Sequence, residues 1–200
     1  MRALTHQALD LNQPFHTVEL AEAALARARG NVDRGTEALL LVTAARAYGA
    51  SDRGRDAARA LLAAEDALLA GDGIVPGYAA ASGPVASTVA SHTGRTLTAM
   101  GDHQAAERHY RTAMVGRVPQ TYQRVRGLTI ANLAKAVASQ RRHEEAVILW
   151  NQCLDTMDGV ASDRNRRELK TVRSAMAVYT ARGIPGAAEL AQRVSELALH

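Results

Sequence analysis

The chain has 200 residues, a length that suits one globular domain or a short array of repeats. Hydrophobic residues make up 47% of it but aromatic residues only 4%, and much of the apolar content is Ala and Leu, the strongest helix formers. The runs of β-branched residues that buried strands need are absent from the sequence. The composition therefore predicts an all-α protein.

The net charge of +4 reflects an excess of Arg, but most Arg residues alternate with Glu and Asp. That pattern is typical of solvated helix faces, and the densest basic run (Arg164, Arg166, Arg167 and Lys170) is interpreted in the same way rather than as a nucleic-acid contact. A single cysteine, Cys153, excludes an internal disulfide and fits a reducing compartment. With no signal peptide and no apolar run of about 20 residues, we expect a cytoplasmic protein that contacts neither membrane nor nucleic acid.

Gly, Pro and polar turn signals divide the sequence into ten segments with helical spacing of apolar residues. Pro84 and Pro185 are expected at first helical positions, and Gly101 and Gly183 at helix ends. The predicted helices cover residues 2–12, 15–29, 34–49, 54–70, 84–100, 103–116, 120–140, 143–157, 162–182 and 185–199.

Residues 71–83 are long for a helix–helix connection and predict a linker loop. The linker separates N-terminal hairpins in residues 1–70, whose first repeat lacks an earlier partner helix, from repeats in residues 84–200. We expect these parts to form one continuous domain.

Residues 89–114 and 129–154 repeat one pattern at an offset of 40 positions, from Gly94 to Ala134. The first copy has Gly94, Ala106, Tyr110 and Ala113; the second has Ala134, Ala146, Trp150 and Cys153. Small residues coincide with small ones and a large ring with a large ring. Such a pattern is typical of helical hairpins, so we expect Gly94 and Ala106 to face each other.

This pattern resembles the tetratricopeptide repeat (TPR) family, which pairs a small residue in helix A with an Ala twelve residues later, then a ring and another small residue. The Gly101-Asp102 turn also matches, although the 40-residue period exceeds the family's usual 34. Weaker copies surround Ala45 and Tyr48, and Met176 with Ala188. The resemblance implies stacked antiparallel hairpins in a right-handed solenoid, and a protein-binding function.

Ala- and Arg-rich stretches such as residues 18–30, 36–50 and 101–114 give a second, narrower resemblance. They are similar to the C-terminal repeat regions of actinobacterial transcriptional regulators that carry an N-terminal helix-turn-helix of the XRE type. In those regulators the repeat region is a sensor or dimerisation module. The sequence leaves open whether this chain is such a region or a stand-alone relative.

Catalytic and metal-binding motifs are weak by comparison. The seven His residues are scattered without paired ligand spacing, Cys153 occupies a small packing position, and the glycine-rich residues 71–77 lack the Lys of a phosphate loop. Adjacent carboxylates such as Glu144 and Glu145 point in different directions around a helix. We therefore expect no enzyme, no metal and no cofactor.

Basic and polar residues occupy the positions that face the concave groove in proteins with the resembled fold. Arg46, Arg95 and Lys135 each follow a small packing residue, and Asn132 with Lys135 stands where similar family members hold a ligand carboxylate. The complete set of candidate groove residues is Arg46, Ser91, His92, Arg95, Asn132, Lys135, Lys170 and Arg173. The alternative is that basic residues of an Arg-rich sequence fall at these positions without a role.

The sequence thus favours a TPR-type binding module, the sensor or protein-interaction region of a regulatory protein. Its partner would be a protein or peptide, or an acidic small ligand, captured in the groove through charge-assisted hydrogen bonds. Two alternatives are kept: a pure scaffold or homodimerisation domain, and an enzyme that uses the groove as its active site.

Overall fold

We describe a computed structural model of the protein over residues 1–11, 13–71, 75–77, 82–118, 121–157 and 163–197, without the side chains of residues 14 and 163–166. Every regular element in these residues is an α-helix, which confirms the all-α prediction. The helices are α1 (Arg2–Asp10), α2 (Pro14–Ala28), α3 (Arg34–Gly49), α4 (Gly54–Leu69), α5 (Val85–Ala99), α6 (His103–Val115), α7 (Gln123–Ser139), α8 (His143–Met157), α9 (Asp163–Ala181) and α10 (Ala187–Leu197).

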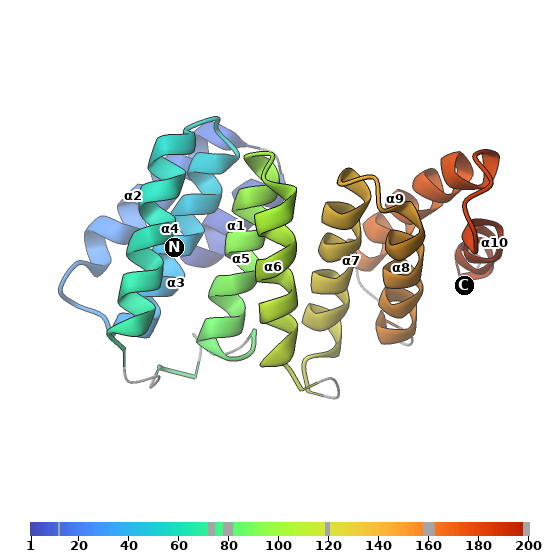
Figure 1. Ribbon diagram of the computed structural model, residues 1–200. Coiled ribbons are helices and arrows are strands. Elements are labelled where there is room, and N and C mark those ends of the chain that lie inside the picture. Colours follow the sequence, from blue (N-terminus) through green and yellow to red (C-terminus); the bar gives the residue numbers. More distant parts are fainter. Residues whose placement is uncertain (12, 72–74, 78–81, 119–120, 158–162, 198–200) are drawn as a thin grey trace. The chain divides into compact units, whose positions relative to one another are not determined.

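Consecutive helices pack in pairs: α1 with α2, α3 with α4, α5 with α6, α7 with α8 and α9 with α10 (Figure 1). The chain divides into two compact units, an N-terminal unit (Met1–Arg117) and a C-terminal unit (Val118–His200). The boundary between the units therefore follows residue 117 and does not fall at residues 71–83. Helix α5, which comes after residues 71–83, packs against both α3 and α4, which come before them. Most of the segment that we expected to be a linker (72–74 and 78–81) lies outside the described residues.

Local backbone chemistry explains the starts of α3 and α6 and the end of α5. Asp33 and Asp102 cap α3 and α6, accepting hydrogen bonds from the backbone N–H of Thr36 (2.7 Å) and Ala105 (2.9 Å). Gly101 follows α5 with a φ of +84°, a left-handed conformation that suits glycine.

Neither proline that we expected at a first helical position occupies one, and α7 begins at Gln123 rather than at residue 120. Pro84 is the N-cap of α5 rather than its first helical residue. Helix α10 begins at Ala187 rather than at Pro185, because Gly186 has a φ of +73°, which no right-handed helix contains. The packing position of α10 is correspondingly Ala187, which is fully buried, whereas Ala188 is exposed.

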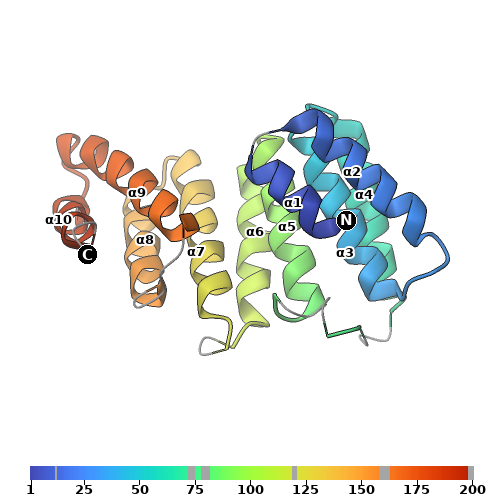
Figure 2. The same cartoon turned by 180° about the vertical axis from the view of Figure 1, so that it is seen from behind.

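Small side chains let the helices of the N-terminal unit approach closely. One core cluster lies between α3, α4 and α5, and a second joins α2 to α3 through Ala21, Ala44 and Ala47. Helix α1 lies across one side of α3 and α5, as the two opposite views of the unit agree (Figures 1 and 2). Residues of α1, α3 and α5 consequently come together on that side.

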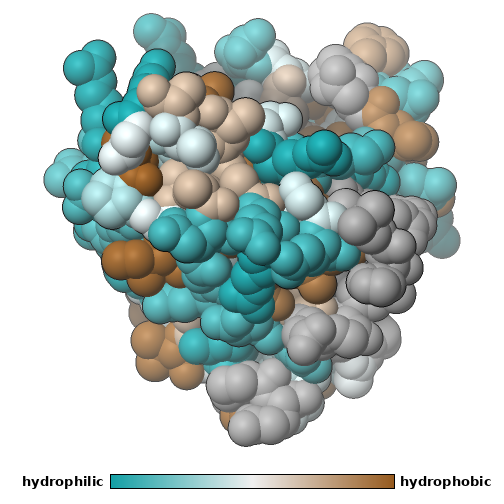
Figure 3. All heavy atoms as spheres, turned by 90° about the vertical axis from the view of Figure 1, so that its right-hand side faces the viewer, coloured by the Kyte–Doolittle hydropathy of each residue, from teal (hydrophilic) through white to brown (hydrophobic). Residues whose placement is uncertain are grey.

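The C-terminal unit is built around larger side chains. Trp150 is 2% exposed, and the Tyr179 ring lies 6.0 Å from it between ring centroids. The hydroxyl of Tyr179 also lies 3.1 Å from Nδ1 of His143, so that one residue of α9 contacts two of α8. Figure 3 shows the face at the α10 end, where hydrophobic atoms are interspersed with hydrophilic ones. Within the described residues, no helix is long and apolar enough to cross a membrane.

Candidate functional site: a basic cluster in the N-terminal unit

Five basic side chains converge where α1 lies across α3 and α5. We call them the basic cluster: Arg2 and His6 from α1, Arg46 from α3, and His92 and Arg95 from α5. Each residue is half-buried, so its charge or ring is partly withdrawn from water without being sealed off. Charges held in this way interact more strongly with one another than charges on the open surface do.

The two histidines of the cluster form a stacked pair. The rings of His6 and His92 are nearly parallel, at 16°, with their centroids 4.9 Å apart. Nη1 of Arg46 lies 2.9 Å from Nδ1 of His6 and 3.2 Å from Nδ1 of His92. A guanidinium nitrogen can only donate, so both Nδ1 atoms accept and both rings are neutral with their proton on Nε2.

Protonation of either ring would place a second positive charge beside Arg46. At about 4 Å, and with the effective dielectric constant typical of protein sites, two like charges repel by about 4 kcal/mol. Burial lowers the pKa of His92 well below its usual value, and the charges of Arg46, Arg95 and Arg2 lower it further, as would a charge on His6. Ligand-free His92 is therefore neutral at physiological pH.

Packing between α5 and α6 fixes the position of Arg95. Gly94, the preceding residue, leaves room for the ring of Tyr110, which is 1% exposed. The Tyr110 hydroxyl lies 3.2 Å from that of Thr98, and Arg95 and Arg46 are close enough for their charges to lower the pKa of this tyrosine, although burial raises it overall. Arg95 thus follows a residue at which α5 and α6 are in close contact.

A further arginine, Arg117, lies close to Arg95 at the end of the N-terminal unit. It is 2% exposed, and burial together with the charge of Arg95 lowers its pKa to about 10. Burial also lowers the pKa of Arg2, whose Nε atom is buried and has no hydrogen-bond partner among the described residues. The positive field of the cluster therefore extends from α1 to the residues after α6.

Three of the residues that we predicted from the sequence belong to this cluster: Arg46, His92 and Arg95. Ser91, predicted with them, is buried in α5 at 7% exposure. Sequence reasoning missed Arg2 and His6, and no local pattern could have indicated them, because their place depends on how α1 crosses α3 and α5.

The predicted residues of the C-terminal unit do not gather in the same way. Lys135 forms an ion pair with Glu168, with 2.5 Å between Nζ and Oε2, so a carboxylate of the unit itself offsets its charge. Asn132 is half-buried on α7, and Lys170 and Arg173 are exposed on α9. In the basic run around residue 164, the side chains of Arg164 and Arg166 lie outside the described residues, and Arg167 is exposed.

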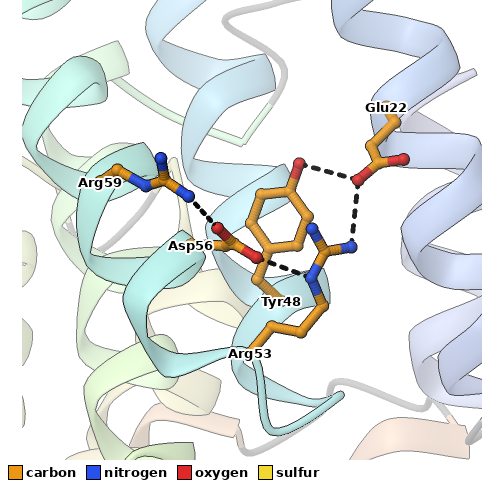
Figure 4. A network of polar contacts seen from close by, with 5 residues as sticks. All are labelled: Glu22, Tyr48, Arg53, Asp56 and Arg59. Carbon is orange, nitrogen blue, oxygen red and sulfur yellow. Dashed lines mark hydrogen bonds and ion pairs between the residues drawn. The ribbon is translucent and has the colours of Figure 1, made fainter.

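Another polar network, distinct from the basic cluster, joins α2, α3 and α4 (Figure 4). Oε1 of Glu22 accepts from the Tyr48 hydroxyl (3.2 Å) and from Nη1 of Arg53 (3.1 Å). Arg53 also covers the Tyr48 ring and donates to Asp56, which pairs in turn with Arg59. Positive and negative charges alternate here, so the network is internally compensated, as a structural contact between helices requires.

The single cysteine is placed for packing rather than for reaction. Cys153 is 1% exposed, and burial raises the pKa of its thiol to about 12, which disfavours the nucleophilic thiolate. In the part of the chain that the structure describes, no three His, Cys, Asp or Glu side chains are arranged to hold a metal ion.

The solved structures that resemble this chain are repeat proteins. Two crystal structures of a provisionally named kinesin light chain from Podosopora anserina, with nearly identical TPR-like repeats, match it with TM-scores of 0.67 and 0.66. Each is 18% identical, and the matches cover 98% of this chain and 91% and 92% of those chains. The chain has a TPR-like fold.

The TPR-like fold confirms the predicted architecture of helix-hairpin repeats. No protein-family model matches the chain, and no curated protein sequence matches it at a significant level. At 18% identity, the likeness to these structures shows the fold alone. The fold does not identify the residues that bind a partner, which depend on the geometry and charge of the site.

Proposed function

We propose that the chain is a binding module of a regulatory protein and that it captures an anionic ligand, a peptide or an acidic small molecule, at the basic cluster. The convergence of Arg2, Arg46 and Arg95 around the His6–His92 pair is the observation that carries this proposal. Bringing like charges together costs free energy, and packing alone does not require it. An anion would relieve that repulsion and accept charge-assisted hydrogen bonds.

Capture would act on the repeats through the helices that supply the cluster. Its side chains come from α1, α3 and α5. An anion that binds side chains of all three helices therefore favours one arrangement of these helices over others. The similarity to the repeat regions of XRE-type regulators supports a sensor role of this kind. A change of helix arrangement or of self-association would then report the ligand.

The cluster proposal can be tested with the full-length chain and a fluorescein-labelled acidic hexapeptide, with affinity measured by fluorescence anisotropy. We expect the Arg46→Gln/Arg95→Gln variant to bind at least about tenfold more weakly than the parent, because each charge-assisted hydrogen bond contributes about 1.5–3 kcal/mol. The matched control is Arg55→Gln/Arg59→Gln, which removes the same charge from exposed positions of α4 and should bind like the parent. Thermal melts would verify that each variant is folded.

Equal affinities for the cluster variant and the α4 control would show that binding reflects net charge alone, and the proposal would fail. If the parent itself does not bind this peptide or other anions at physiological ionic strength, the scaffold alternative takes its place.

A further inference from the structure

We infer that the basic cluster recognises a dianionic phosphate group rather than a single carboxylate, and that His92 takes up a proton when the group binds. This inference rests on the proposed function and specifies its ligand. It follows from three features of the cluster: the directions from which the donors come, the hydrogen-bonding state of the two rings, and the amount of positive charge.

The donors approach from three separate helices. Arg2 and His6 come from α1, Arg46 from α3, and His92 and Arg95 from α5. A carboxylate presents two oxygens in one plane, and one arginine fork satisfies both of them. A phosphate presents three acceptor oxygens in different directions, which matches donors that arrive from several sides.

The hydrogen bonds of Arg46 describe a ligand-free state that an anion would reorganise. Nη1 of Arg46 carries two hydrogens, and it lies within hydrogen-bond distance of both His6 and His92. A protonated imidazole donates from both nitrogens and no longer accepts from Arg46. Protonation of His92 therefore releases one Nη1 hydrogen of Arg46 and adds an imidazolium N–H donor, both of which a phosphate can use.

The positive charge of the cluster explains why His92 takes up a proton only when the anion binds. The groups that lower the pKa of His92 include His6 and Arg2 from α1, Arg46 from α3 and Arg95 from α5 itself. From α6, the neutral phenol of Tyr110 lies near Arg46 and Arg95, and Arg117 follows that helix close to Arg95. These cations disfavour a charged ring in the free protein. Two negative charges placed among them offset most of this repulsion, and a dianion does so more fully than a carboxylate.

The phosphate group could belong to a small molecule or to a phosphorylated peptide, and one set of probes distinguishes the two sources. Binding of O-phosphoserine and of a hexapeptide that contains phosphoserine would be measured by calorimetry on the full-length chain, each beside its counterpart with glutamate. We expect each phosphorylated probe that binds to exceed its glutamate counterpart by at least about tenfold. Binding of both phosphorylated probes indicates that a small molecule suffices, and binding of the peptide alone indicates a phosphopeptide.

Proton uptake would be measured with sulfate, because sulfate stays dianionic between pH 6 and 7.5 while phosphate does not. Each proton taken up on binding should tighten sulfate about tenfold per pH unit as the pH falls. The calorimetric heat should also differ between buffers of different ionisation enthalpy. His92→Gln should reduce this pH dependence, whereas substitution of His109, a half-buried histidine of α6 outside the cluster, by Gln should leave it unchanged.

The outcomes separate this inference from the proposed function. Glutamate probes that bind as tightly as phosphorylated ones, with Arg46 and Arg95 required, would overturn the phosphate inference and leave the anion-binding function standing. Sulfate binding that is independent of pH would overturn the proton uptake. No binding of any of these anions at the cluster would overturn both.

Discussion

The ring of Tyr110 occupies the space that a side chain at Gly94 would need. A Cβ atom at residue 94 would lie 2.7 Å from Cε1 and 2.8 Å from Cδ1 of that ring. The three atoms nearest to this position all belong to Tyr110. The glycine therefore admits a ring from α6, and the ring in turn holds α5 and its Arg95 in place.

Gly94→Ala should consequently destabilise the protein. Overpacking a tight core costs about 1–3 kcal/mol, which outweighs the gain of up to about 1 kcal/mol that alanine brings to a helix. Urea unfolding followed by circular dichroism would measure the difference. Gly54→Ala is the matched control, because a Cβ there meets no atom closer than Cε of Met100, at 4.0 Å, and it should not destabilise. A Gly94→Ala protein as stable as the parent would contradict the packing described here.

The turns of the two strongest repeats offer a test of backbone strain. Gly101 has a φ of +84°, and Arg141, the equivalent residue 40 positions later, has a φ of +64°. A residue with a Cβ is disfavoured in this left-handed conformation by about 1–2 kcal/mol. Gly101→Ala should therefore destabilise by about 1 kcal/mol although no atom lies within 4 Å of the new Cβ, while Arg141→Gly should be neutral or stabilising. Thermal melts of both variants would check this, and a clear loss of stability in Arg141→Gly would refute it.

Local sequence signals were enough for the helices and their pairing. Glycine, proline and capping signals mark most helix ends, and the 3.6-residue spacing of apolar positions marks the faces that pack. The errors occur where these signals were ambiguous. Pro185 suggested a helix start, but the left-handed Gly186 delays α10 to Ala187 and moves the packing position by one residue.

The candidate site was only partly predictable because it is non-local. Arg46 and Arg95 could be found, since each follows a small packing residue in its repeat. The contribution of His6 depends on the path of α1 across α3 and α5, which no short sequence pattern specifies. The partner of Lys135 was equally hidden, because Glu168 is 33 positions further along the chain (135 to 168).

The ion pair between Lys135 and Glu168 predicts a compensating pair of substitutions. The Glu168 side chain is 19% exposed and that of Lys135 33%, so Lys135→Gln leaves a partly buried carboxylate without its counter-charge. We expect that variant to lose about 1–2 kcal/mol, because a desolvated charge that loses its partner is costly. The double variant Lys135→Gln/Glu168→Gln should recover most of the loss in urea unfolding. Additive effects of the two substitutions would mean that the pair does not contribute to stability.

The histidine pair predicts that acid destabilises the ligand-free protein. The pKa of His92 in the folded chain lies well below its usual value of about 6.5, which the unfolded chain retains. Below about pH 6.5 the unfolded state therefore binds a proton that the folded state does not. The free energy of unfolding should fall as the pH falls, by up to about 1.4 kcal/mol per pH unit for this group, until the folded pKa is reached. Above about pH 7.5 both states are neutral at His92, and its contribution is constant.

Urea unfolding at pH 7.5, 6.5 and 5.5 would measure this slope, and His92→Gln should reduce it. The slope will not vanish, because burial also lowers the pKa of His109, which adds a contribution of the same sign. Arg46→Gln should reduce the slope too, since the charge of Arg46 is one of the causes of the low pKa of His92. An unchanged slope in both variants would mean that His92 is protonated as easily in the folded chain as in the unfolded one. The arrangement in which Arg46 donates to two neutral rings would then be wrong.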